Sequence, residues 1–79
     1  MRYEILLPAV GDATGGEVSE WYRSTDDVVQ AGEPLVAIDI DKITIEVPSP
    51  AAGTLTIALP RAAHVALGDV LGWVTASEG

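Results

Sequence analysis

The stretch IDIDKITIEV, from Ile38 to Val47, indicates how this chain folds. Apolar and polar residues alternate on both sides of Asp41-Lys42, a pattern typical of two half-buried strands joined by a tight turn. With a two-residue loop at Asp41-Lys42, every apolar residue faces an apolar partner, whereas a shift of one residue would oppose isoleucines and polar residues. The predicted cross-strand pairs are Ile40/Ile43, Asp39/Thr44, Ile38/Ile45 and Val36/Val47. We expect a type I turn, because Asp-Lys lacks the Asn-Gly signature of type I′.

Short alternating runs recur elsewhere in the chain, and helical periodicity is weak throughout. Tyr3, Ile5 and Leu7 share one face of a predicted first strand, and Val18 and Trp21 have an odd spacing that suggests a bulge in the next. Turn residues separate these runs, so the pattern predicts an all-β architecture of short strands. The expected strands after the first cover residues 17–22, 35–40, 43–47, 55–59 and 70–75.

The two halves of the sequence resemble each other. The segment VQAGEPLVAI at 29–38 aligns with VALGDVLGWV at 65–74, an offset of 36 residues, and GEV at 16–18 aligns with GTL at 53–55. This predicts a flattened β-barrel or sandwich of two four-stranded antiparallel sheets with pseudo-two-fold symmetry, a barrel-sandwich hybrid. We expect one domain over 1–79, with half-repeats of about 1–40 and 43–77 joined by the Asp41-Lys42 hairpin.

Composition excludes several classes of function. The 79 residues carry 12 acidic and 4 scattered basic side chains, a net charge of −8 that argues against nucleic acid and against an anionic membrane surface. Cysteine is absent and there is one histidine, so we expect no disulfide and no metal site. No apolar run approaches the length of a membrane span. We expect a monomeric, cytoplasmic domain, although a processed domain of the mitochondrial matrix would look the same.

Lys42 is the only lysine of the chain. A lysine in a turn usually just keeps the turn soluble. Here it is also placed on the axis that relates the two half-repeats, at a convex tip without a cleft. These features favour a residue that is presented to other proteins over one that catalyses a reaction locally.

The residues around Lys42 match a known family. Asp41-Lys42, followed by EVPSPAAG at 46–53, resembles the lipoyl domains of 2-oxo acid dehydrogenase complexes, and the resemblance continues through LPAVG at 7–11, Trp21, Ala31-Gly32 and Gly68. It implies that Lys42 is amide-linked to lipoate and that the chain is part of a dihydrolipoamide acyltransferase. By itself the domain would be a non-catalytic swinging arm.

The resemblance also implies the partners. They are a lipoate-attaching enzyme, a thiamine-dependent 2-oxo acid dehydrogenase, an acyltransferase core and a dihydrolipoamide dehydrogenase. Asp39-Ile40 and Ile43 depart from the family, which often has Glu-Thr or Glu-Ser before the Asp-Lys pair and Ala or Val after it. Residues expected to assist modification or partner recognition are Asp12, Asp39, Ile40, Asp41, Ile43 and Glu46.

Two other readings use the same residues. A biotin carrier domain of a carboxylase would share the fold and the hairpin lysine, but its lysine is typically flanked by Met, which is absent here. The chain could also be an unmodified β-sandwich interaction module. An enzyme is not expected, since His64 has no Ser or Cys partner motif and no nucleophile–base pair is evident.

Overall fold

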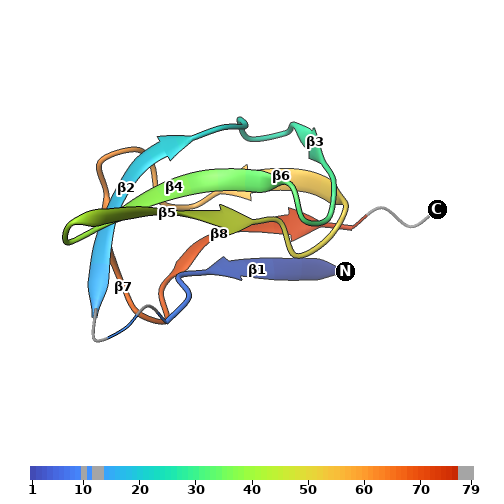
Figure 1. Ribbon diagram of the computed structural model, residues 1–79. Coiled ribbons are helices and arrows are strands. Elements are labelled where there is room, and N and C mark those ends of the chain that lie inside the picture. The colour runs from blue at the N-terminus through green and yellow to red at the C-terminus, as the bar shows by residue number, and fades with distance from the viewer. Residues whose placement is uncertain (10, 12–13, 77–79) are drawn as a thin grey trace.

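The computed structural model describes residues 1–9, 11 and 14–76, and this part of the chain forms eight strands (Figure 1). No helix within these residues is long and apolar enough to cross a membrane. The strands are β1 (Arg2–Leu6), β2 (Gly15–Trp21), β3 (Val28–Val29), β4 (Pro34–Ile40), β5 (Ile43–Pro48), β6 (Gly53–Ile57), β7 (His64–Ala66) and β8 (Val70–Thr75).

The strands form two four-stranded antiparallel sheets, as the sequence predicted. One sheet has the order β1-β8-β6-β3 and the other β5-β4-β2-β7. Replacing each strand by the one four places away converts the first order into the second, which confirms the pseudo-two-fold symmetry. The sheets pack as a sandwich rather than a closed barrel. Each half of the chain supplies two strands to each sheet, so the halves are interleaved.

The core lies between the sheets and draws on both. β4 is its most buried strand, with four consecutive buried residues from Leu35 to Ile38 and a fifth at Ile40, so the first arm of the predicted hairpin is fixed by packing. The residues at 0–1% exposure are Ile5, Val18, Val29, Leu35, Val36, Ile38, Leu55, Leu71 and Val74.

The predicted irregularity of the second strand is present. The pairing of β2 with β4 shifts between Val18 and Glu20, and beyond this bulge the Nε1 of Trp21 donates a hydrogen bond to the carbonyl of Leu59 at 2.8 Å. The bulge therefore turns Trp21 toward the segment after β6. A bulge of this kind bends its strand and increases the local right-handed twist of the sheet.

Some predicted boundaries were wrong. β6 ends at Ile57 rather than at residue 59, and His64 is the first residue of the strand β7. β3 and β7, of two and three residues, were not predicted. Edge strands this short have no room for an alternating pattern, and the pairing partner alone makes them strands.

Candidate functional site: the lysine hairpin

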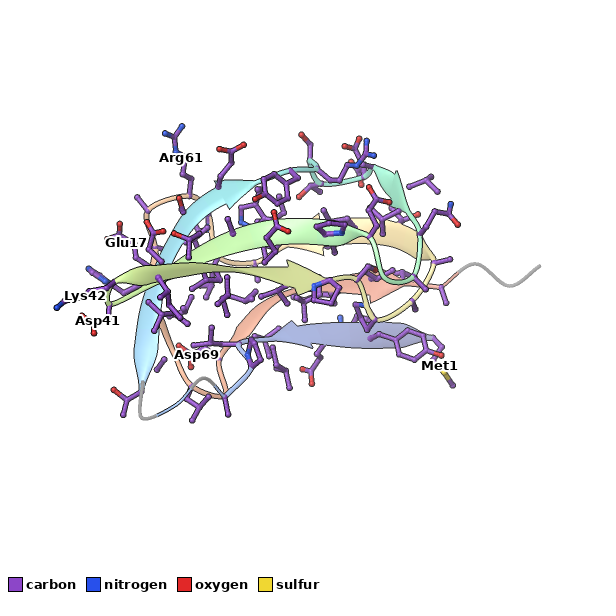
Figure 2. The ribbon with its side chains drawn as sticks, in the orientation of Figure 1. Met1, Glu17, Asp41, Lys42, Arg61 and Asp69 are labelled. Atoms are coloured by element: carbon purple, nitrogen blue, oxygen red, sulfur yellow. The ribbon has the colours of Figure 1, made fainter. Side chains whose placement is uncertain are left out.

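The hairpin of β4 and β5 has the predicted register. Val36 pairs with Val47, Ile38 with Ile45, Asp39 with Thr44 and Ile40 with Ile43, which leaves Asp41-Lys42 as a two-residue loop. The molecule extends 40 Å along its long axis. Lys42 projects into solvent from one end of it, and Met1 lies at the other (Figure 2).

The turn itself differs from the prediction. Asp41 has a φ of 54°, whereas Lys42 is not among the residues with positive φ. A type I turn requires negative φ at both positions, so the type I prediction was wrong, and the positive φ at the first loop residue is a feature of the primed turns. The physical reason is strand twist: primed turns match the right-handed twist of the flanking strands, and Asp tolerates the left-handed region better than most residues.

The strand residues that flank the two-residue loop are held on both faces of the hairpin. On the outer face, the Oγ1 of Thr44 donates a hydrogen bond to Oδ1 of Asp39 at 2.7 Å. On the inner face, Ile40 is 3% exposed and anchors the loop in the core, while its partner Ile43 is 51% exposed. Of the two isoleucines that flank Asp41-Lys42, Ile43 is therefore the one that offers apolar surface beside Lys42, and Ile40 can act on a partner only through the backbone.

The surroundings of Lys42 are acidic. Asp39 and Asp41 are exposed on the hairpin, and Glu17 of β2 is the cross-strand neighbour of Asp39 (Figure 2). Like charges that face each other across a ladder are destabilising. The ion pair found among the described residues joins Arg23 to Glu33, and none joins Lys42 to another described residue.

One of the predicted recognition residues, Glu46, is not at the hairpin tip. Glu46 is four residues along β5 from Lys42, about 13 Å at the usual rise of a strand. It accepts a hydrogen bond from the hydroxyl of Tyr22 at 2.9 Å, which raises the pKa of Tyr22, and it lines a shallow open groove with Arg23, Glu33 and Pro34. Asp12 lies outside the described residues.

One neighbour of the hairpin was missed. Gly16, the second residue of β2, lies so close to the end of β4 that a side chain there would collide with the backbone of Asp39. The alignment of Gly16 with Gly53 was the available signal, because Gly53 makes the equivalent close approach to Thr75 in the other sheet. No group of three or more metal-ligating side chains gathers within the described residues.

Comparison with known proteins identifies the family. The model of the biotin/lipoyl family, described as "Biotin-requiring enzyme", matches residues 3–74. The match covers nearly the whole chain and includes the hairpin with Lys42. The chain therefore belongs to the biotin/lipoyl attachment family, which agrees with the predicted fold and the predicted class.

Relatives of the chain include acyltransferase components. It is 35% identical over 74 residues to the dihydrolipoyllysine-residue succinyltransferase component of the 2-oxoglutarate dehydrogenase complex of Rickettsia conorii, which covers 91% of this chain and 19% of the relative. It is 44% identical over 54 residues to the dihydrolipoyllysine-residue acetyltransferase component of the pyruvate dehydrogenase complex of Mycobacterium bovis, which covers 67% and 10%. The chain thus spans a fifth or less of these relatives.

Solved structures with a similar fold include a lipoyl domain and a carboxylase. The lipoyl domain of the 2-oxoglutarate dehydrogenase complex from Azotobacter vinelandii has a TM-score of 0.76 and 28% identity, covering 94% of this chain and 96% of that domain. A single-chain long-chain acyl-CoA carboxylase matches with a TM-score of 0.71 at 22% identity, which shows the fold alone. Together with the relatives, the whole-domain match supports a lipoyl carrier over a biotin carrier.

Proposed function

We propose that Lys42 is the attachment point of lipoate and that this chain is the carrier domain of a dihydrolipoamide acyltransferase. The observation that carries the proposal is the placement of the only lysine, at a two-residue hairpin tip of a domain similar in its full length to a lipoyl domain. The tip is exposed and makes no ion pair with a described residue, so an amine there is accessible to a modifying enzyme.

The residues present fit a covalently bound lipoyl group. The neutral amine of Lys42 would attack the carboxyl carbon of an activated lipoate, the activating group would leave with the bonding electron pair, and the nitrogen would lose one proton. The amide abolishes the charge of Lys42 and leaves Asp39 and Asp41 to dominate the potential of the tip. When bound, lipoate supplies a dithiolane that can be reductively acylated and reoxidised.

In this proposal the hairpin tip exposes the lipoyl-lysine, and partner enzymes catalyse the reactions of the lipoyl group. Lys42 projects into solvent from an exposed turn, and we propose that each step takes place in a partner's active site. We propose as partners a lipoate-attaching enzyme, a thiamine-dependent 2-oxo acid dehydrogenase, an acyltransferase core and a dihydrolipoamide dehydrogenase, in the cytoplasm. The relatives include both 2-oxoglutarate and pyruvate complexes, and the proposal covers either substrate.

Intact-mass measurement tests the attachment. We expect the protein, co-expressed with a lipoate-attaching enzyme and lipoate, to gain the mass of one lipoyl group, and the Lys42→Arg variant to gain none. Arginine keeps the charge and length but cannot form the amide under these conditions. Co-expression with a biotin-attaching enzyme is the matched control. A biotin increment, or an unmodified lysine in both experiments, would reject the proposal.

A further inference from the structure

We infer that Gly16 is a positioning residue for Lys42. Because Gly16 has no side chain, the end of β4 can lie in close contact with β2, and this contact determines the position of the hairpin tip. This inference rests on the proposed function of Lys42. It assigns a role in modification to a residue that is distant from Lys42 in sequence and on another strand.

The geometry around Gly16 leaves no space for a side chain. A methyl group on its Cα would lie 2.5 Å from the carbonyl oxygen of Asp39, 2.9 Å from Cγ1 of Ile40 and 3.1 Å from Cγ2 of Ile38. Contacts below 3.0 Å require that something moves. The first atom belongs to the backbone, and it cannot yield by a change of rotamer.

Gly16 approaches β4 at Asp39, the last residue of β4 that pairs with β2. Glu17 pairs with Asp39, and beyond that pair no further pairing joins β2 to β4. On its other side Gly16 pairs with Val65 of β7, so a movement of β2 away from β4 would also have to displace β7. A displacement of Asp39 would therefore pass to Asp41 and Lys42, two and three residues along the chain.

An equivalent close approach occurs at the symmetric position, which is not next to the hairpin. A close approach of this kind therefore also contributes to the packing of the strands. A side chain on Gly53 would collide with the carbonyl of Thr75, the residue 36 places after Asp39. Gly72 in β8 is a third close approach, to the carbonyl of Thr56, and it pairs with Ile5 and Ile57 in the sheet that does not contain the hairpin. Gly72 therefore offers a matched control.

The test compares Gly16→Ala with Gly72→Ala. Both place a methyl group against a backbone carbonyl within a strand, so both lower stability, but only the first pushes on the hairpin. We expect Gly16→Ala to slow lipoylation of Lys42 at least about ten-fold per folded molecule, since misplacing a reacting group by about 1 Å can lower a rate roughly a hundredfold. Gly72→Ala should stay within about two-fold of the unsubstituted protein by the same reasoning.

The assay uses the whole chain, a purified lipoate-attaching enzyme, and sucrose to favour the folded state of every variant. The folded fraction comes from circular dichroism and the rate from intact mass. Equal rates for the two variants would overturn the inference. An unmodified parent protein would reject the proposed function itself, and this inference with it.

A measurement on the unsubstituted protein decides the matter even if Gly16→Ala does not fold. Positioning requires that the tip be held, so the backbone amides of Asp41 and Lys42 should show NMR order parameters near those of the strands, about 0.85. Values below about 0.6 would mean a flexible tip that no neighbour positions, and would overturn the inference.

Discussion

At the scale of single residues, Asp41 and Lys42 have different roles in the turn. Asp41 accepts the positive φ that the twist of the strands demands, and Lys42 keeps an ordinary φ and projects outward. The loop therefore uses its acidic residue for backbone geometry as well as charge. This explains how a turn without Asn-Gly can still join the strands with two residues.

The positive φ of Asp41 makes opposite predictions for two substitutions. Asp41→Val should lower the free energy of unfolding by about 1–2 kcal/mol, because a β-branched residue is strained in the left-handed region. Asp41→Gly should leave it unchanged or slightly raised, because glycine adopts this φ without strain. Urea unfolding followed by tryptophan fluorescence measures both. Equal losses for the two variants would contradict the φ assigned to Asp41.

At the scale of elements, the bulge in β2 is tied to the rest of the fold by Trp21. Its ring packs against the core, and its Nε1 reaches the carbonyl of Leu59, 38 residues away in the chain. One hydrogen bond thus joins the end of β2 to the segment that leads into β7. The bulge is a fixed part of the architecture rather than a local irregularity.

Trp21→Phe should therefore lower the free energy of unfolding by about 1–3 kcal/mol, since it removes a hydrogen bond as well as some buried ring area and leaves the carbonyl of Leu59 unpaired. Trp73→Phe is the control: Trp73 stacks with Arg2, at 4.7 Å from guanidinium carbon to ring centroid, and its ring N–H makes no hydrogen bond with a described residue. Its loss should be smaller, about 0.5–1 kcal/mol. Thermal and urea unfolding would measure the loss of stability in both variants. A larger loss for Trp73→Phe than for Trp21→Phe would contradict the role of the Trp21 hydrogen bond.

At the scale of the whole molecule, stability depends on pH through a surface carboxylate at the end of the hairpin that is remote from Lys42. The backbone N–H of Gln30 donates to Oε1 of Glu33 at 3.0 Å and, with the side chain of Arg23, holds the pKa of Glu33 below its usual value. A carboxylate whose pKa is lowered by folding stabilises the folded state above its usual pKa. That contribution disappears as the pH falls through the lowered pKa.

Glu33→Gln should consequently lose most of its effect in acid. The variant should unfold at a lower urea concentration than the parent at pH 7, and the difference should shrink as the pH falls below about 4, near the usual pKa of glutamate. Urea midpoints measured between pH 2.5 and 7 would show the convergence, with Glu4→Gln as an exposed control. A difference independent of pH would argue against this role for Glu33.

Most of the fold and the hairpin could be predicted because the responsible patterns are local or repeated. Alternation fixed the register of Ile40 and Ile43, and the repeat of 29–38 at 65–74 predicted two matching sheets. The type of turn was predicted wrongly because strand twist, rather than residue preference, decides it. Gly16 was missed because a close approach depends on how two distant strands cross, which no local pattern expresses.

The interleaving of the two halves has a mechanical consequence. Four of the six strand pairings join strands of different halves: β1 with β8, β2 with β7, β3 with β6 and β4 with β5. A pull between Lys42 and Met1, at opposite ends of the long axis, runs along β1, β4 and β5, whereas β2 crosses this direction near the Lys42 end (Figures 1 and 2). It loads the hydrogen bonds of the ladders in shear, many at once, instead of opening them one after another. Tension on the hairpin tip is thus carried by both sheets together.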